Sequence, residues 1–135
     1  MIIGIGYDIV DIRRIERVIR LYGERFLERV FVDSERLTCQ QRRYRGACYA
    51  QRFAAKEACA KALGTGMRQG VSWRSIVVQR DSLGGTQLVL HGGAERQLRR
   101  KMQAYNGPTQ PVRLHLTLSD TRLFATAFVM IDIGS

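Results

Sequence analysis

Several features that mark secreted, membrane-bound or cysteine-stabilised proteins are scarce in this sequence of 135 residues. Its three cysteines, Cys39, Cys48 and Cys59, are odd in number and form no C-x-x-C pair or zinc-ligand spacing. We therefore expect reduced thiols in a cytoplasmic protein. No basic leader precedes the short apolar run at the N-terminus, and no apolar run approaches the roughly 20 residues that span a bilayer. Secretion and membrane insertion are not indicated.

Acidic residues are also few. Lys and Arg total 22 against 12 Asp and Glu, which gives a formal charge of +10 and a pI near 10.4. Such a charge predicts a polyanionic partner. Nucleic acid, an anionic lipid surface, a phosphorylated cofactor and a very acidic protein all satisfy it, so the sign of the charge does not identify the partner.

The first half of the chain predicts one strand and several helices. Residues 2–10 are typical of a buried strand whose backbone is approached closely at Gly4 and Gly6. Asp11 is placed to cap a helix that ends at Gly23, and Asp33 or Ser34 could cap a shorter one. Residues 47–63 are rich in alanine and predict a long central helix that Gly64 and Gly66 end.

The second half changes to a strand-like pattern. We expect strands at 75–79, 86–90, 112–118 and 124–133, with a hairpin turn at 81–85 and a polar turn at 119–122. A helix is expected over 94–105, ending at Asn106-Gly107-Pro108. No repeat or linker divides the chain. The sequence thus predicts one α+β domain, residues 1–135, with a mainly antiparallel sheet packed against the long central helix.

Two places could carry chemistry. Asp8 follows an apolar strand directly, where a buried carboxylate needs a cation or hydrogen-bond donors, although a capping or turn role is an alternative. Phe53, Glu57 and Lys61 share one helix face, and Glu57 before Lys61 also suits a surface ion pair worth about 0.3–0.5 kcal/mol. The flanking alanines suggest packing instead. With the Gly-Thr-Gly turn at 64–66, these residues make a plausible site for a metal and a phosphate.

Two separated motifs carry a family resemblance. The opening G-I-G-Y-D-I-V-D-I-R-R-I-E and the stretch R-F-A-A-K-E-A-C-A-K-A-L-G-T-G, together with G-V-S-W-R-S-I at 70–76, resemble the holo-acyl-carrier-protein synthase branch of the 4′-phosphopantetheinyl transferases. The resemblance covers nearly the whole chain, in order and at the family's spacing. It implies transfer of 4′-phosphopantetheine from coenzyme A to a serine of apo acyl carrier protein, which gives the holo-protein and adenosine 3′,5′-bisphosphate and supports fatty acid biosynthesis.

The resemblance also assigns residues. Asp8 and Glu57 match metal-binding carboxylates that hold Mg²⁺ against the coenzyme A pyrophosphate, and Glu57 and Lys61 match catalytic positions. The serine proton would go to Glu57 directly or to a metal-bound water, and both remain open. The positions that match coenzyme A contacts are Arg52, Lys56, Lys61, Gly64, Thr65, Gly66 and His115.

Two departures from the family pattern refine the resemblance. Many relatives carry Ser-His after the penultimate strand, whereas this chain has Ser119 and Asp120. Longer relatives bear a second metal-binding carboxylate where this chain has Val10. The second departure is typical of the short branch, whose members assemble as trimers with active sites between subunits, and we expect the same here.

An arginine-rich helix face offers a docking surface for the acidic carrier protein, which would raise the association rate in a salt-sensitive way. A solvated basic face is the alternative. The arginines concerned are Arg13, Arg14, Arg17 and Arg20.

The sequence also allows three alternative interpretations. A non-enzymatic RNA- or DNA-binding module fits the charge but lacks a recognised motif. A transferase for polyketide or peptide-synthetase carrier domains would keep the chemistry and change the client. A catalytic thiol at Cys59 is disfavoured because only His91 and His115 exist and both fall on strand-like segments.

Overall fold

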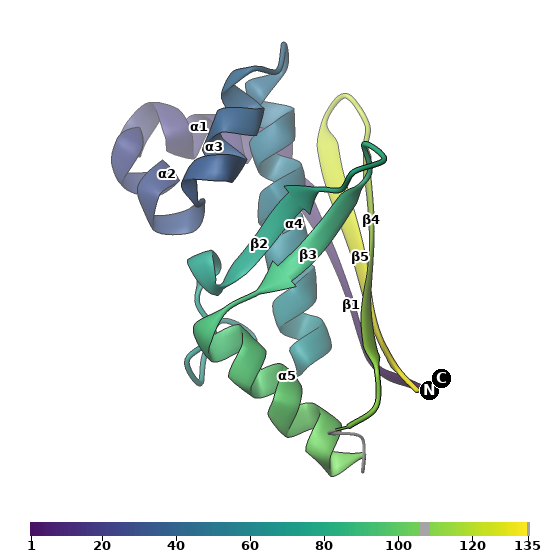
Figure 1. The fold of residues 1–135 in the computed structure, drawn as a ribbon. Coiled ribbons are helices and arrows are strands. Elements are labelled where there is room, and N and C mark those ends of the chain that lie inside the picture. Colours follow the sequence, from purple (N-terminus) through teal and green to yellow (C-terminus); the bar gives the residue numbers. More distant parts are fainter. Residues whose placement is uncertain (106–108, 135) are drawn as a thin grey trace.

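The computed structural model describes residues 1–105 and 109–134, and Figure 1 shows their arrangement. The helices are α1 (Ile12–Tyr22), α2 (Glu24–Val30), α3 (Asp33–Gln40), α4 (Arg45–Leu63) and α5 (Gly92–Ala104), with a 3-10 turn, η1, at Trp73–Ser75. The strands are β1 (Ile2–Asp11), β2 (Ile76–Arg80), β3 (Thr86–Leu90), β4 (Val112–Asp120) and β5 (Phe124–Ile133).

All strand pairs are antiparallel, which confirms the predicted α+β class with antiparallel pairing. The strands form two sheets, one of order β1-β5-β4 and one of β2-β3. Helix α4 contacts strands of both sheets, and the short hairpin lies across α4 in Figure 1. The two chain ends lie side by side, where the Met1 ammonium donates a hydrogen bond of 3.0 Å to Asp132.

Strand β1 packs very closely against α4. A Cβ atom built on Gly6 would lie 1.7 Å from the carbonyl oxygen of Ala58, and one on Gly4 would lie 2.2 Å from that of Ala62. Backbone meets backbone here, so no side chain fits at either glycine. The predicted close approach at Gly4 and Gly6 is confirmed, and it fixes the distance between strand and helix.

The buried-strand interpretation of residues 2–10 is correct for only one face. Gly6 and Val10 are buried on the α4 side, whereas Ile5, Tyr7 and Ile9 are each more than half exposed. The reason is that α4 covers a single face of the three-stranded sheet. The outer face carries large apolar side chains that nothing within the described residues covers.

Most predicted boundaries hold within a few residues. Asp11 caps α1 as expected, since its carboxylate accepts a hydrogen bond of 2.9 Å from the Arg13 backbone. Strand β4 continues to Asp120, so the turn predicted at 119–122 begins later. The helix stop predicted at residues 106–108 lies outside the described residues.

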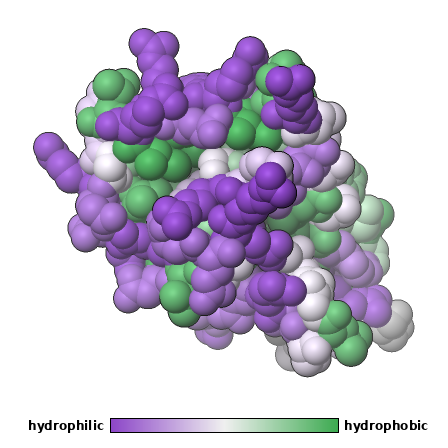
Figure 2. All heavy atoms as spheres, turned by 90° about the horizontal axis from the view of Figure 1, so that it is seen from above, coloured by the Kyte–Doolittle hydropathy of each residue, from purple (hydrophilic) through white to green (hydrophobic). Residues whose placement is uncertain are grey.

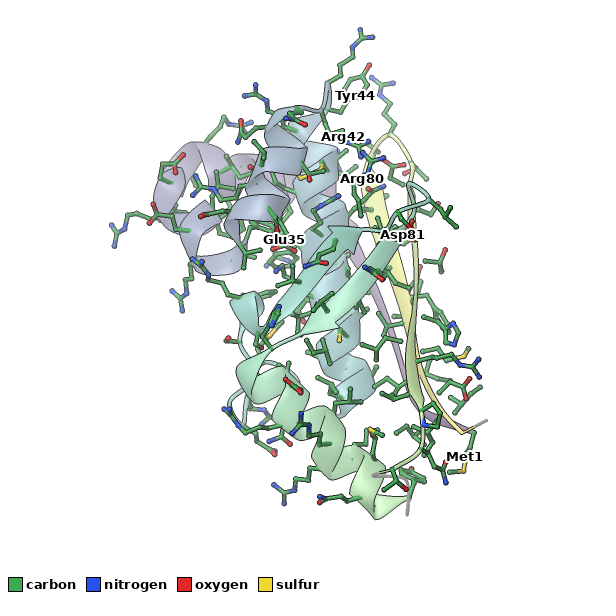
Figure 3. All side chains as sticks on the ribbon, viewed as in Figure 1. Met1, Glu35, Arg42, Tyr44, Arg80 and Asp81 are labelled. Atoms are coloured by element: carbon green, nitrogen blue, oxygen red, sulfur yellow. A yellow bond between two sulfur atoms is a disulfide. The ribbon has the colours of Figure 1, made fainter. Side chains whose placement is uncertain are left out.

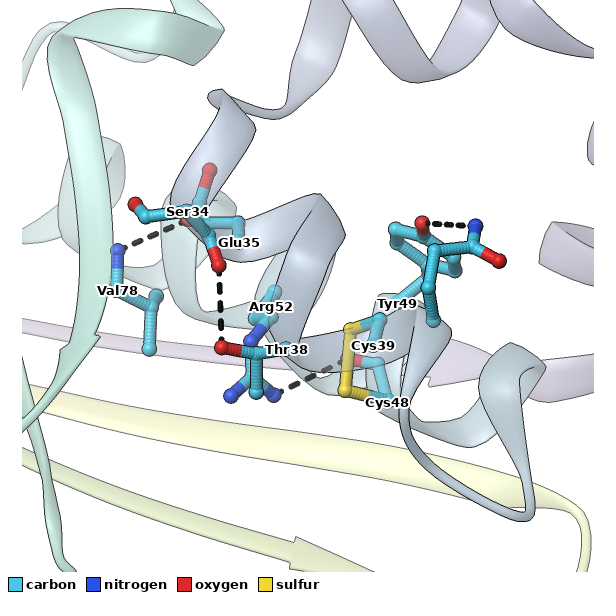
Figure 4. The surroundings of a disulfide bond; sticks show 9 residues. Ser34, Glu35, Thr38, Cys39, Cys48, Tyr49, Arg52 and Val78 are labelled. Atoms are coloured by element: carbon cyan, nitrogen blue, oxygen red, sulfur yellow. Dashed lines mark hydrogen bonds between the residues drawn. A yellow bond between two sulfur atoms is a disulfide. The ribbon is translucent and has the colours of Figure 1, made fainter.

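The prediction of three reduced thiols is wrong for two of them. Cys39 at the end of α3 and Cys48 in the first turns of α4 form a disulfide with a Cα–Cα distance of 5.4 Å (Figure 4). Tertiary packing of α3 on α4 juxtaposes them, and no local spacing motif signals that contact. Cys59 stays a free, buried thiol. Among the described residues no helix is long and apolar enough to cross a membrane.

Candidate active site

The candidate site forms where β1 crosses α4. Gly4, Gly6 and Asp8 alternate along β1 and share its inner face, so the glycine contact also brings the Asp8 carboxylate to α4. Lys61 donates hydrogen bonds from Nζ to Asp8 Oδ1 at 3.0 Å and to the Tyr7 carbonyl oxygen at 2.9 Å. The Asp8 side chain is 16% exposed and that of Lys61 51% exposed. The Lys61 side chain is therefore open to solvent, whereas the Asp8 carboxylate is largely sheltered.

Glu57 completes this cluster one helical turn before Lys61. Burial raises the pKa of the half-buried Glu57 carboxyl above its usual value, and the negative charge of Asp8 raises it further. The Lys61 ammonium opposes that shift. The charges of Asp8 and Lys61 thus both act on Glu57, in opposite directions.

The donor set fits a hard divalent cation. Two oxygen-bearing carboxylates that repel each other are stabilised by a cation, and Mg²⁺ takes few protein carboxylates together with substrate phosphate and water. Among the described residues no cluster of three or more Asp, Glu, His or Cys is found. The protein thus offers Asp8 and Glu57, a number that leaves coordination positions for a phosphate.

The turn after α4 lies next to the cluster. Gly64 ends the helix in the left-handed conformation with φ 85°, and Gly66 has φ 62°. Thr65 Oγ1 donates a hydrogen bond of 2.7 Å to the Gly66 carbonyl oxygen. This turn begins three residues after Lys61, and Gly64 and Thr65 line a surface pocket of about 340 Å³ together with Arg100 and Lys101.

Lys56 points away from this cluster. Its side chain has no exposed surface, and Nζ donates to Glu35 Oε1 at 2.8 Å, to the Trp73 carbonyl at 3.0 Å and to the Ile76 carbonyl at 2.6 Å. Glu35 also accepts hydrogen bonds from the backbones of Val32 and Val78. All three ammonium hydrogens are thus used inside the protein, and the structure does not bring Lys56 to the solvent-facing site.

Arg52 lies further toward the start of α4 and is only 3% exposed. It donates to the Cys48 carbonyl at 3.4 Å, while its Nε has no hydrogen-bond partner among the described residues. Burial lowers the pKa of Arg52, and the charges of Arg42 and Arg80 add to that effect. Figure 3 shows Arg42 and Arg80 at the same end of the molecule.

His115 lies on β4 opposite Met130 and belongs to the outer face of the sheet. Its side chain is 53% exposed, with Nε2 3.8 Å from Asp132 Oδ2. The sheet therefore separates His115 from Asp8, Glu57 and Lys61, and a single chain does not bring them together.

The α1 arginines are all exposed, at the end of the molecule that Figure 2 views, where hydrophilic side chains surround smaller apolar patches. Arg13 is engaged by Asp11 at 2.7 Å. Within the described ranges Arg14, Arg17 and Arg20 make no ion pair. Their charges are therefore open to an external partner.

Sequence reasoning missed two features of α4. Glu35 was not foreseen as the partner of Lys56, because 21 residues separate them and Glu35 sits in a polar stretch. Arg42 and Arg43 were not foreseen beside Arg52 either, although all three line a pocket of about 430 Å³. Only the run of basic residues at 42–45 hinted at the second feature.

Comparison with known proteins identifies the family of the chain. A family model described as the 4′-phosphopantetheinyl transferase superfamily matches residues 4–117. The holo-[acyl-carrier-protein] synthase of Methylorubrum extorquens strain PA1 is 54% identical over 132 residues, covering 98% of this chain and 94% of that protein. The chain therefore belongs to the 4′-phosphopantetheinyl transferase superfamily and, within it, to the holo-[acyl-carrier-protein] synthases.

Solved structures show the same fold. The crystal structure of the Neisseria meningitidis holo-[acyl-carrier-protein] synthase is 36% identical with a TM-score of 0.80, covering 98% of this chain and 99% of that one. The Helicobacter pylori enzyme, solved in complex with coenzyme A, is 30% identical with a TM-score of 0.75, covering 95% and 99%.

Proposed function

We propose that this protein transfers the 4′-phosphopantetheine group from coenzyme A to a serine of an apo acyl carrier protein, releasing adenosine 3′,5′-bisphosphate. Residues 1–135 would act as one transferase domain. The observation that carries the proposal is the Asp8–Lys61–Glu57 cluster at the β1–α4 contact. Its relatives named as holo-[acyl-carrier-protein] synthases support the substrates, and one of their structures holds coenzyme A.

Each residue of the cluster has a role in this reaction. Asp8 and Glu57 would hold Mg²⁺, which when bound supplies positive charge to the pyrophosphate. Lys61, half exposed and directed at Asp8, is placed to stabilise the leaving 3′,5′-bisphosphate with Gly64, Thr65 and Gly66 nearby. Glu57 would also lie where it could accept the proton of the attacking serine, with a water molecule at the site as the alternative acceptor.

The first experiment incubates the protein with apo acyl carrier protein, coenzyme A and Mg²⁺ and weighs the carrier protein by mass spectrometry. A gain of one phosphopantetheinyl group that EDTA abolishes is expected. Asp8→Asn and Glu57→Gln should lose the activity, whereas Glu95→Gln on the surface of α5 should keep it. No gain with several carrier proteins and a verified fold would overturn the proposal, and a gel shift with nucleic acid at physiological salt would replace it.

We also propose a trimer with active sites between subunits. The uncovered apolar face of the three-stranded sheet supports an assembly, since Ile5, Tyr7 and Ile9 are more than half exposed. His115 on that same face supports shared sites, because only another subunit could carry it to an Asp8 cluster. Light scattering should give three times the chain mass. Mixing inactive Asp8→Asn and His115→Ala subunits should restore part of the activity, and an unrestored mixed trimer would contradict shared sites.

The acidic carrier protein would dock on α1. The exposed Arg14, Arg17 and Arg20 support this, together with the net charge of +10. Replacing Arg14 or Arg17 by glutamate should raise KM for the carrier protein and leave coenzyme A affinity unchanged, with Arg99→Glu on α5 as the charge-matched control. An unchanged KM would remove α1 from the interface.

A cytoplasmic location and a supply of holo-carrier for fatty acid biosynthesis complete the proposal. Cell fractionation with antibodies to this chain tests the first. Loss of carrier modification after depletion of the protein tests the second.

A further inference from the structure

The disulfide and the arginine pocket share residues. A pocket of about 430 Å³ lies at the start of α4, opposite the end that carries the Gly-Thr-Gly turn. Cys48 is one of its walls, and the bond to Cys39 ties that wall to the end of α3. The pocket is lined by Arg42, Arg43, Tyr44, Ala47, Cys48, Gln51, Arg52, Thr86 and Asp120.

The pocket is chemically suited to an anion. Only 3% of the Arg52 surface is exposed, and its Nε lacks a hydrogen-bond partner among the described residues. Arg42 and Arg43 add two charges against one carboxylate, Asp120. A buried guanidinium with an open donor is costly without an acceptor. A phosphate group in the pocket would lie among the three arginines and would relieve the repulsion among their charges.

The segment that carries Arg42 and Arg43 has little else to hold it. Among the described residues its backbone hydrogen bonds are those of turns, from Gln41 to the Thr38 carbonyl at 3.3 Å, from Arg42 to the Cys39 carbonyl at 3.1 Å and from Cys48 to the Tyr44 carbonyl at 3.2 Å. The disulfide closes this segment across nine positions of sequence. Both arginines therefore sit on a loop whose two ends are joined covalently.

Arg52 is also coupled to the disulfide, because its guanidinium donates to the backbone carbonyl of Cys48, one residue of the bond. Figure 4 shows Arg52 beside the two sulfur atoms. Breaking the bond would thus free the loop that carries Arg42 and Arg43, while Cys48 and Arg52 stay on α4.

We propose that the Cys39–Cys48 pair is a redox switch. Its disulfide holds the loop of Arg42 and Arg43 beside Arg52, in position for the phosphorylated ribose end of the nucleotide, and its reduction weakens nucleotide binding. This rests on the proposed function, whose substrate is coenzyme A. Disulfides that persist in a reducing compartment are usually regulatory or transient, so the bond gives a cytoplasmic transferase a way to respond to thiol status.

The reductant is a dithiol. Its thiolate attacks Cys48 Sγ, the sulfur that borders the pocket, and the Sγ–Sγ bond breaks with Cys39 leaving as a thiolate that takes up a proton. The second thiol then resolves the mixed disulfide. Two electrons and two protons pass to the protein, which gains two thiols while the dithiol becomes a disulfide. Cys39 is 0% and Cys48 6% exposed, so the pocket is the route of attack.

The same geometry predicts a reciprocal effect. A nucleotide in the pocket covers Cys48 and binds the oxidised form more tightly, so it must oppose reduction as strongly as reduction opposes binding. A tenfold difference in affinity would lower the reduction potential of the pair by about 30 mV.

The test uses the whole protein and adenosine 3′,5′-bisphosphate as the probe. Thiol counting by mass after alkylation comes first, and two protected cysteines are expected in the oxidised protein. Calorimetry should then give at least tenfold weaker probe binding after dithiothreitol. Saturating probe should slow reduction at least fivefold. Circular dichroism must show that the reduced chain remains folded.

Matched variants distinguish an effect of the disulfide on probe binding from effects of the arginines and of Cys59. Cys59→Ala should keep the full redox response, whereas Cys39→Ala/Cys48→Ala should bind weakly whether or not reductant is present. Arg42→Gln/Arg43→Gln should bind weakly in both states, and Arg99→Gln on α5 should behave as the unaltered protein. If the double cysteine variant fails to fold, reduction of the unaltered chain still decides.

Three results would overturn the switch. One is equal probe affinity in the oxidised and reduced protein, and another is three free thiols after treatment with diamide; both leave the transferase activity intact. The third is no binding of the probe in either state together with no metal-dependent transfer, which overturns the proposed function and the switch with it.

Discussion

Lys56 and Lys61 lie five residues apart on α4 and occupy opposite environments. Lys56 has no exposed surface and is held by Glu35 and two backbone carbonyls, whereas Lys61 is half exposed and reaches across to Asp8. Five residues turn a helix by about 500°, so the two side chains leave it on different faces. The comparison teaches that residue type alone does not assign a role in this motif; the face of the helix does.

We expect the largest effect on stability from substitution of Lys56. Lys56→Met would leave Glu35 charged and without its ammonium in the interior, which typically costs about 3–5 kcal/mol. Urea unfolding should show that loss. Lys56→Met/Glu35→Leu should recover only part of it, because neither charge remains but the backbone groups that the pair had bonded lose their partners. A single variant as stable as the unaltered protein would mean that the buried pair contributes nothing.

The faces of α4 also show what the sequence could predict. Helical spacing placed Glu57 and Lys61 together, and the glycines of residues 2–10 foretold the backbone contact that brings Asp8 to them. These are periodic signals within single elements. The partner of Lys56 and the Cys39–Cys48 bond depend on how α3 packs against α4, and no local pattern encodes that packing.

The family resemblance could assign residues to the site by position but could not show where their side chains point. It carried Lys56 over as a coenzyme A contact because sequence similarity preserves a residue's position and not the direction of its side chain. The structure places that ammonium inside the protein. His115 is the complementary case, since the structure places it on the outer sheet face, away from Asp8, and its proposed role depends on the proposed second subunit.

The exposed face should respond in activity and not in stability. Lys61→Met removes an exposed ion pair worth at most about 1 kcal/mol to folding. It also removes the charge that we propose stabilises the leaving group, and losses of about 10²–10³ in kcat are typical for such a group. Steady-state kinetics beside urea unfolding checks both. A Lys61 variant that unfolds as easily as Lys56→Met, or turns over normally, would contradict the division of roles.

The contact that positions the exposed face can be tested at Gly6. Gly6→Ala would push a methyl group to within 1.7 Å of the Ala58 carbonyl, and strand and helix would have to separate. Overpacking of this kind costs about 1–3 kcal/mol. Mg²⁺-dependent activity should fall as well, because Asp8 moves with the strand. Calorimetric unfolding and the mass assay measure the two effects, and a variant with unchanged activity would show that the contact does not set the site.

We expect the smallest effect on stability from Cys59, which lies about one helical turn from Lys56 and is buried like it. Burial raises the pKa of its thiol from 9.0 to about 12, against a weak opposing effect of the Lys56 charge. The thiol therefore stays protonated in the folded chain while the unfolded chain ionises above pH 9.0, so stability is retained below that pH and declines as the pH rises toward 12. At pH 8 iodoacetamide should not modify Cys59 in the folded protein and should modify it at once in urea. If Cys59 reacted as fast in the folded chain as in the unfolded chain, it would lie on an accessible surface. The contrast between a buried face of α4 at Lys56 and an exposed face at Lys61 would then fail.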